Sequence, residues 1–311
     1  MIRTLQLVTT PRPFFRQQVE VLKSRGISST TVSVPRPVEG SRSPRDYANF
    51  YRSVLRHVAT GRFDLVHANY GLVAPFALAQ PVRPVVLTLW GSDVMSDADW
   101  LTRLSAAAAR RSDAVVAPSV AIADRLDCDH EVVPFGVDTE RFRPMDRTEA
   151  RRDLGWDPDA RIVLFPYDPE RAVKNYPLAE RVVDGLPVDA ELKVMSGVPY
   201  EAVPAYMNAS DAVLVTSRRE SGPMVVKEAA ACAVPVVSTD VGFARAVLDG
   251  VAHSHVCSSE HDLVAGLTEA VSTDERADGR DRIDALGLDA MGERLHAVYE
   301  DALDWTVEVP A

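Results

Sequence analysis

Short runs of apolar residues recur along the whole chain and alternate with longer stretches of mixed character. Runs of this kind, rich in valine and leucine, are typical of strands that a parallel sheet buries on both faces. We predict strands at residues 5–8, 30–34, 64–67, 85–89, 114–117, 161–166, 190–194, 211–216, 234–238 and 251–256. The fourth residue of the run at 64–67 is His67, which we interpret as either a structural or a catalytic residue.

The stretches between these runs carry the periodicity of amphipathic helices. Between Tyr47 and Val58, apolar side chains recur every three or four positions, whereas Arg45, Arg52 and Arg56 lie off this stripe. Because strand and helix alternate throughout, the pattern indicates α/β domains with doubly wound parallel sheets. The alternation restarts at residue 161, and 311 residues are enough for two domains with separate cores.

The stretch from residue 211 to 242 combines two apolar runs with a helix signal between them. Ser221 and Gly222 are candidate N-caps, and Pro223 suits the first helical position, where no amide partner is lost. The amides of Met224 and Val225 would then lack partners within the helix and lie at its positive end. This arrangement favours the binding of a phosphate.

Two glutamates flank this helix start. Glu220 precedes it, and Glu228 lies four residues beyond Met224 on one helix face, with seven residues between the two glutamates. A ligand with a phosphate in the middle and hydroxyl-rich rings on both sides fits this spacing, and a nucleotide sugar is such a ligand. The alternative is that both glutamates are solvated charges around an ordinary helix start, because short motifs recur by chance.

Segment 216–242 resembles the signature of the family 4 glycosyltransferases, in which two glutamates are separated by seven residues around a Gly-Pro helix start. These are retaining enzymes of the GT-B architecture. The resemblance implies an α/β fold of two doubly wound, Rossmann-like domains that face each other across a cleft. It assigns Glu220 to the hydroxyls of the donor sugar and Glu228 to the ribose of the nucleotide. The donor would further contact Ser221, Gly222, Pro223, Met224 and Val225.

Loop 168–175 resembles the family loop that holds the donor diphosphate with an arginine and a lysine. These residues would be Arg171 and Lys174, although Arg171 lies closer to the lysine than is usual in the family. Two cations at this place would stabilise the negative charge of a departing diphosphate. The alternative is a solvated basic loop.

Trp90-Gly91-Ser92-Asp93 resembles the His-Gly-Ser-Asp loop that faces the donor sugar in this family, with tryptophan in place of histidine. Gly91 would let the backbone approach a ligand, and Asp93 would accept hydrogen bonds from sugar hydroxyls. Alternatively, the segment only caps a helix. The first loop, residues 9–13, lacks the glycines usual in the family, and we place its Arg12 on the acceptor side together with Gly91 and Ser92.

The resemblance also implies a division of labour between domains. Residues 1–140 would bind the acceptor, residues 141–290 would bind the nucleotide sugar, and the helix at 291–311 would return to the first domain. The implied function is transfer of a sugar to a glycan or lipid-linked acceptor in the synthesis of cell-surface polysaccharide or glycoconjugate. Alternatives are a nucleotide-sugar epimerase or phosphorylase of the same architecture, or a nucleotide-sugar-binding subunit without turnover.

Composition narrows the class of protein. With 46% hydrophobic and 25% charged residues, the chain is typical of a globular protein, and no apolar run approaches the roughly 18 residues of a membrane span. The start lacks the apolar core of a signal peptide, and the three scattered cysteines favour a reducing, cytoplasmic setting. We expect no cofactor and no metal, because the Asp-Xaa-Asp triplets at 97–99, 127–129 and 157–159 do not follow strong strands.

The net charge of −11 is unevenly distributed. The first 62 residues contain 11 basic and 3 acidic residues, a net charge of +8. Arg42 and Arg45 lie in or beside a proline-rich loop, and the family resemblance places this region near the acceptor and the membrane. We therefore expect peripheral contact with anionic lipid at the inner face of the membrane, and no nucleic-acid partner. The alternative is that these arginines are dispersed over several faces.

Overall fold

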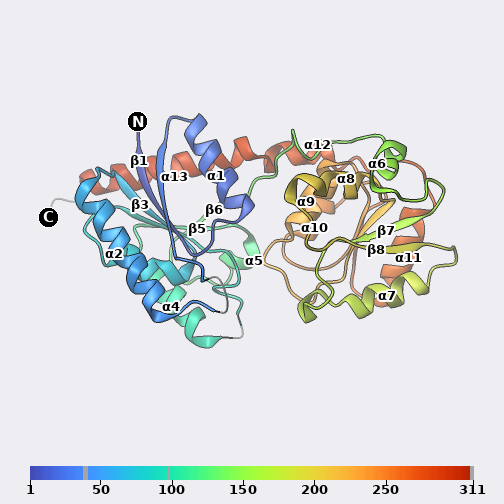
Figure 1. Ribbon diagram of the computed structural model, residues 1–311, viewed down its shortest axis with the longest axis horizontal. Coiled ribbons are helices and arrows are strands. Elements are labelled where there is room, and N and C mark those ends of the chain that lie inside the picture. Colours follow the sequence, from blue (N-terminus) through green and yellow to red (C-terminus); the bar gives the residue numbers. More distant parts are fainter. Residues whose placement is uncertain (38–40, 97, 309–311) are drawn as a thin grey trace. The chain divides into compact units, whose positions relative to one another are not determined.

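The computed structural model describes residues 1–37, 41–96 and 98–308, which form two compact units (Figure 1). The first unit comprises Met1–Gly136 and Leu288–Ala311, and the second comprises Val137–Gly287. The chain therefore leaves the first unit after Gly136 and returns to it at Leu288, where the sequence-based division places these points at residues 140 and 291. Residues 309–311 of the expected C-terminal helix lie outside the described residues.

The first unit is built on a parallel sheet with the strand order β2-β1-β3-β4-β5-β6. Its strands are β1 (Arg3–Val8), β2 (Ser28–Ser33), β3 (Leu65–Asn69), β4 (Val85–Thr88), β5 (Ala114–Ala117) and β6 (Glu131–Val132). Its helices are α1 (Pro13–Ser24), α2 (Pro44–Thr60), η1 (Gly71–Val73), α3 (Ala74–Leu78), α4 (Asp99–Ala109), α5 (Val120–Ala123) and α13 (Leu288–Glu308).

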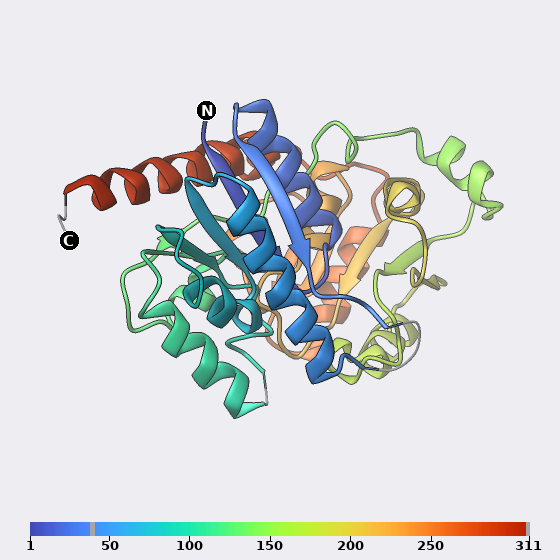
Figure 2. The same cartoon turned by 60° about the vertical axis from the view of Figure 1, so that its left-hand side comes forward.

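Helices cover both faces of this sheet. Leu5 and Leu7 of β1 face an apolar cluster that includes Phe50 and Val54 of α2. The opposite face lies against α1 and α13, which run side by side, whereas α2 and α4 lie on the other side of the sheet (Figures 1 and 2). Alternate residues of one strand are thus buried against helices on opposite faces, as the doubly wound arrangement requires.

A buried polar network joins the sheet of the first unit to α13. The Tyr299 hydroxyl lies 2.6 Å from Nδ1 of His67 and accepts a hydrogen bond from Gln6 Nε2 at 3.1 Å. Nε2 of His67 lies 2.7 Å from the Thr88 hydroxyl, and Asn69 donates to Gln6 at 2.8 Å. His67 is fully buried, and burial lowers its pKa to about 3, so its ring is neutral. The structure therefore supports the structural interpretation of His67 and contradicts a catalytic one.

The second unit repeats the plan with the strand order β11-β10-β9-β7-β8, again parallel. Its strands are β7 (Ile162–Phe165), β8 (Glu191–Val194), β9 (Ala212–Val215), β10 (Val236–Thr239) and β11 (His255–Cys257). Its helices are α6 (Arg147–Leu154), η2 (Ala172–Lys174), α7 (Tyr176–Asp184), η3 (Tyr200–Ala202), α8 (Val203–Asn208), α9 (Met224–Ala231), α10 (Ala244–Leu248), α11 (Glu260–Val271), α12 (Arg280–Ile283) and η4 (Asp284–Leu286).

Neighbouring residues of the central strands of this unit enter two different apolar clusters. Leu164 of β7 packs in the cluster with α8 and α9, whereas Val163 and Phe165 pack in the cluster with α7 and α11. This alternation confirms a doubly wound sheet in the second unit as well. A sheet buried on both faces also explains why its strands were visible in the sequence as continuous apolar runs.

Two predicted elements differ from the structure. The run at 251–256 was expected to be one strand, but β11 contains only His255–Cys257. The preceding residues form a turn, in which His253 has φ +57° and the Ser254 N–H donates to the Val251 carbonyl at 3.2 Å. Conversely, β6 pairs with β5 at residues for which the sequence analysis predicts no strand. Among the described residues, no helix is both long and apolar enough to cross a membrane.

The buried network predicts a clear effect of Tyr299→Phe. Loss of this hydroxyl leaves Nδ1 of His67 without its buried partner and removes one of the hydrogen bonds of Gln6, so the free energy of unfolding should fall by about 1–3 kcal/mol. Urea unfolding followed by circular dichroism measures it. Tyr51→Phe is the matched control, because the Tyr51 hydroxyl donates to the Ala79 carbonyl at 3.0 Å near the surface. Equal losses in both variants would contradict a special role for the network.

Candidate active site

The helix predicted to bind a phosphate is α9, which connects the neighbouring parallel strands β9 and β10. It begins at Met224, one residue later than predicted. Pro223 is the N-cap residue, because its backbone is still extended, with φ −71° and ψ 98°. Its carbonyl oxygen accepts the Val226 N–H at 3.0 Å. The placement of Pro223 inside the helix was therefore wrong. The amides of Met224 and Val225 precede that first bond and lie at the helix start.

Gly222 is tightly enclosed in the loop before α9. A Cβ atom at this position would lie 2.3 Å from Cε1 of Phe243, so any side chain would displace the ring. Gly242 has φ +57°, and a Cβ there would lie 2.9 Å from Cδ of Pro223. The loop after β10 thus holds the loop before α9 in place, and both need glycine for this close approach.

The loop that contains Lys174 is fixed to the end of β9. The Thr216 hydroxyl donates to the carbonyl oxygens of Lys174 and Asn175 at 3.0 and 3.1 Å. The Arg218 N–H donates to the Val173 carbonyl at 2.9 Å. These bonds bring the loop after β7 next to the loop after β9, at the carboxyl ends of both strands, where open α/β sheets bind ligands.

Lys174 and Glu220, predicted separately, form an ion pair in the structure. The lysine side chain is 6% exposed and the glutamate side chain is 14% exposed. Ser217 Oγ also donates to Glu220 Oε1 at 2.8 Å. Burial lowers the pKa of Lys174, whereas the Glu220 charge opposes this shift. A lysine and a carboxylate of opposite charge thus share one partly dry position beside α9.

Tyr167 was not singled out from the sequence. It follows β7 by two residues, and its ring lies under the Lys174 ammonium, with Nζ 3.6 Å from the ring centroid. Its position just beyond the carboxyl end of a buried strand was the signal that could have pointed to it. Arg171 lies exposed three residues before Lys174, where its charge lowers the pKa of Lys174 further.

The environment of Glu228 differs from that of Glu220, because its hydrogen-bond partner is neutral. It is 5% exposed on α9 and accepts a hydrogen bond from the Tyr200 hydroxyl at 3.0 Å. Burial raises the pKa of Glu228 to about 7, and the Tyr200 hydrogen bond opposes that rise. The Tyr200 ring packs against Phe142 at 5.5 Å and lies 5.4 Å from the Arg141 guanidinium. Tyr200 was also missed as a site residue, because its contact with Glu228 joins segments 28 residues apart.

Asp93 does not have the environment expected of a sugar ligand. It is fully buried, and its carboxylate accepts backbone N–H bonds from Gly71, Trp90 and Gly91 at 2.9, 3.0 and 2.7 Å. The structure therefore contradicts the prediction that Asp93 accepts sugar hydroxyls, because its oxygens are turned to the backbone. It supports the alternative, in which Asp93 stabilises the loop. Gly91 has φ +101° in this loop, and Ser92 is exposed.

The other predicted residues of the first unit lie around the first loop. Arg12 is exposed at the N-cap of α1. Trp90 packs against Phe14, with ring centroids 4.7 Å apart, and Phe14 contacts Phe135 at 4.6 Å. Arg42 was expected to face lipid, but it donates to the Thr9 carbonyl at 2.8 Å and the Thr10 hydroxyl at 2.6 Å. The Arg42 guanidinium therefore supports the first loop, and its contact with lipid stays a prediction.

The acidic triplets carry local interactions where the structure describes them. Asp127 pairs with Arg110 at 2.7 Å, and Asp157 accepts the N–H of Asp159 at 2.9 Å. Asp97 of the triplet 97–99 lies outside the described residues. Within the described ranges, no group of three or more histidine, cysteine, aspartate or glutamate side chains could hold a metal ion.

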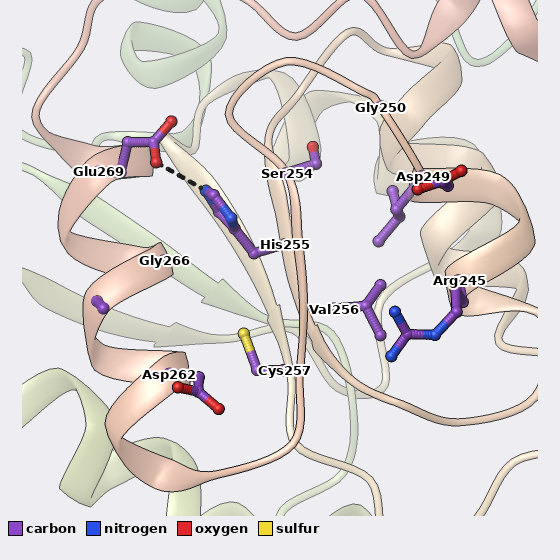
Figure 3. A pocket seen from close by; sticks show the side chains of 12 residues that line it. Arg245, Asp249, Gly250, Ser254, His255, Val256, Cys257, Asp262, Gly266 and Glu269 are labelled. Atoms are coloured by element: carbon purple, nitrogen blue, oxygen red, sulfur yellow. Dashed lines mark ion pairs between the residues drawn. The ribbon is translucent and has the colours of Figure 1, made fainter.

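A separate cavity of about 390 Å³ lies beside the edge strand β11 (Figure 3). Its walls come from α10, β11 and α11, and it contains none of the residues predicted to bind the donor. His255 and Glu269 lie side by side in its wall, with Nε2 and Oε2 3.1 Å apart (Figure 3). Asp262 and Arg245 line the same cavity, so its charged groups are of both signs.

Two family models match the chain. The model described as "Glycosyltransferase Family 4" matches residues 6–141, and the model described as "Glycosyl transferases group 1" matches residues 179–283. The chain is similar to "D-inositol 3-phosphate glycosyltransferase 1" of Catenulispora acidiphila, with 28% identity over 87% of this chain and 79% of that protein. It is 30% identical to "D-inositol 3-phosphate glycosyltransferase" of Mycolicibacterium gilvum over 78% of this chain and 66% of that protein.

The fold is similar to that of solved structures. The crystal structure of Anabaena Alr3699/HepE in complex with UDP-glucose superposes with a TM-score of 0.75 and 14% identity, covering 97% of this chain and 100% of that one. At this identity the likeness concerns the fold alone. Together with the two parallel sheets, it confirms the predicted GT-B architecture of two Rossmann-like domains.

The position of Asp93 predicts a loss of stability in Asp93→Asn. An asparagine offers one acceptor oxygen where three backbone N–H groups now converge, so the free energy of unfolding should fall by about 2 kcal/mol or more. Ser92→Ala is the control, since this exposed residue makes only a 3.3 Å contact with the Tyr70 hydroxyl. Urea unfolding of both variants measures the difference. A loss below about 0.5 kcal/mol in Asp93→Asn would contradict the supporting role.

Proposed function

The chain belongs to the family 4 glycosyltransferases and is an enzyme that transfers sugar, and we propose that it moves a sugar from a nucleotide-sugar donor to a glycan or lipid-linked acceptor with retained anomeric configuration. The observation that carries this proposal is the pair of glutamates beside the start of α9. The partly buried Glu220 is ion-paired with Lys174, and the buried Glu228 is hydrogen-bonded to Tyr200. The names of the relatives and the UDP-glucose held by a fold neighbour support it.

The second unit would bind the donor. The Glu228 carboxylate would accept hydrogen bonds from the ribose, and Glu220 would accept them from the sugar. Ser221 and the backbone from Gly222 to Val225 would hold the phosphates at the helix start, where the dipole and the amides favour an anion. Lys174 would stabilise the charge that develops on the departing diphosphate, with Arg171 adding positive charge at the rim.

The Lys174–Glu220 ion pair holds the ammonium and the carboxylate next to each other before a donor binds. In the free protein each charge neutralises the other, so neither is left alone in a partly buried position. An arriving donor would give each residue a new partner. Its phosphate oxygens would pair with the Lys174 ammonium, and its sugar hydroxyls would donate to the Glu220 carboxylate. We propose that no metal is required, since Lys174 would supply the positive charge that a metal supplies in other transferases.

The first unit would bind the acceptor and the membrane surface. Arg45, Arg52 and Arg56 are exposed on α2, and their spacing of seven and four residues puts them on one line along the helix. Trp100 is 61% exposed at the start of α4, and tryptophan favours the interface between lipid and water. The row formed by these three arginines includes Arg45 of the predicted contact. It would attract anionic lipid by roughly 1 kcal/mol per residue.

A membrane-borne glycan would then be the acceptor in the synthesis of cell-surface polysaccharide or glycoconjugate. We place the enzyme on the cytoplasmic side of the membrane, because its cysteines Cys128, Cys232 and Cys257 are free thiols, as suits a reducing compartment. Residues 1–136 with the C-terminal helix would thus face the acceptor, and residues 137–287 would hold the donor.

The ribose assignment predicts a pH dependence of nucleotide binding. The Glu228 carboxylate is the better acceptor for ribose hydroxyls, and with a pKa of about 7 it ionises as pH rises through neutrality. Affinity for a nucleoside diphosphate should therefore increase roughly tenfold between pH 6 and pH 8. Isothermal titration with UDP, GDP and ADP measures this, and the same affinities should be found in excess chelator.

Matched variants separate the two glutamates. Glu228→Gln should bind the diphosphate more weakly and lose most of this pH step. Glu220→Gln should keep the step, because its carboxylate would contact the sugar, and should instead lower turnover. Wild-type affinity and an unchanged pH step in Glu228→Gln would remove the ribose assignment. Loss of binding in chelator, restored by magnesium or manganese, would contradict a metal-free site.

The arginine row predicts binding to anionic vesicles. The protein should sediment with vesicles rich in phosphatidylglycerol at low salt, and binding should weaken as salt screens the charges. Arg45→Glu/Arg52→Glu/Arg56→Glu should weaken it by at least about tenfold. Arg111→Glu/Arg125→Glu/Arg294→Glu removes the same charge elsewhere in the first unit and should have a much smaller effect. Equal losses in both triple variants would contradict a defined surface on α2.

A further inference from the structure

The Tyr167 ring has no role in the donor site as described so far, yet it is the aromatic surface on which the Lys174 ammonium rests. Nζ lies 3.6 Å from the ring centroid, a short distance for a cation above an aromatic face. The ring is held by Phe165, whose centroid lies 5.6 Å away in an edge-to-face arrangement. Tyr167 therefore presents a fixed, electron-rich face to the ammonium.

Lys174 needs such a face at the moment of reaction. Its side chain is only 6% exposed, and burial disfavours the charged form of a lysine. In the free protein Glu220 compensates for this cost through the ion pair. If Glu220 turns to the donor sugar, as proposed above, this compensation weakens just when the leaving diphosphate requires a positive charge. The aromatic face is the contact that remains.

We propose that Tyr167 is a positioning residue that keeps Lys174 charged and directed at the donor diphosphate while Glu220 is engaged with the sugar. This inference rests on the proposed transferase function and adds a residue to the donor site. The ring face attracts the ammonium through its quadrupole, and the attraction is stronger where water is excluded. The contact also limits the orientations of a flexible side chain before the donor arrives.

The ring, and not the hydroxyl, carries this role. Burial raises the pKa of Tyr167 well above its usual value, and the nearby Glu220 charge adds to the rise, so the phenol stays neutral. The hydroxyl is buried near Ser217 and Glu220, but it makes no well-aligned hydrogen bond to any residue that the structure describes. Phenylalanine at position 167 should therefore preserve function, and an aliphatic residue should not.

Kinetic variants test the proposal. Tyr167→Phe should keep kcat within about twofold of wild type, whereas Tyr167→Leu should lower kcat roughly tenfold with a smaller change in KM for the donor. The alkaline limb of the pH profile should move to lower pH in Tyr167→Leu, because an ammonium without the ring loses its proton more easily. Trp156→Leu is the matched control, since it removes the ring beside Lys193, 5.8 Å from that ammonium and away from the donor site.

A second measurement does not depend on turnover. The chain contains four lysines, so ¹³C-labelled lysine gives few signals, and Lys174→Arg identifies the one of interest. The Hε protons of Lys174 should be shifted upfield by the Tyr167 ring in the wild type and in Tyr167→Phe, but not in Tyr167→Leu. Phenylalanines with one to three ring fluorines at position 167 keep the shape of the ring and weaken its face, so kcat should fall stepwise along this series.

Three outcomes would overturn the proposal. They are an unchanged kcat and alkaline limb in Tyr167→Leu, an equal loss in Tyr167→Phe and Tyr167→Leu, and a kcat indifferent to fluorination. Failure of the proposed function looks different. In that case the wild type neither binds nucleoside diphosphates nor transfers sugar, while the upfield shift of Lys174 still shows whether the ring contact exists.

Discussion

The partly buried ion pair between Lys174 and Glu220 is the constraint on which the proposed donor site depends. Two opposite charges are held at the carboxyl ends of neighbouring strands, and each would be costly to bury without the other. The surrounding bonds all act to keep them together. Thr216 fixes the lysine loop to the end of β9, and the Ser217 hydroxyl donates a hydrogen bond to the Glu220 carboxylate. Such a pair is a poor source of stability but a precise source of geometry, which is what a binding site requires.

The second glutamate of the signature shows how environment divides two identical side chains into two roles. Glu220 has a cationic partner, whereas Glu228 has only the neutral Tyr200 hydroxyl and lies deeper in the protein. Burial without a countercharge raises the pKa of Glu228 to about 7. A carboxyl of this kind can exchange its phenol for ribose hydroxyls at little electrostatic cost. The spacing of the two glutamates was readable from the sequence, but this difference between them was not.

Much of the fold followed from the sequence, because strands buried on both faces appear as apolar runs. The helix start at Met224 was predicted within one residue from Gly222 and Pro223. Contacts between distant segments could not be predicted in this way. Tyr167 contacts Lys174 and Tyr200 contacts Glu228 only because the fold brings these segments together. Asp93 shows a further limit, since an aspartate after Gly-Ser fits a ligand contact and a backbone cap equally well, and only the directions of its three amide partners decide between them.

Departures from the family pattern are concentrated in the first unit. The second unit keeps the two glutamates, the lysine and the Gly-Pro turn, whereas in the first unit a tryptophan replaces the expected histidine and the first loop lacks glycine. The structure shows physical substitutes for both. Trp90 packs edge-to-face on Phe14, and Arg42 satisfies the Thr9 carbonyl of a loop that glycine would otherwise shape. These changes therefore fall in the unit proposed to bind the acceptor, whereas the unit proposed to bind the donor keeps the residues of the signature.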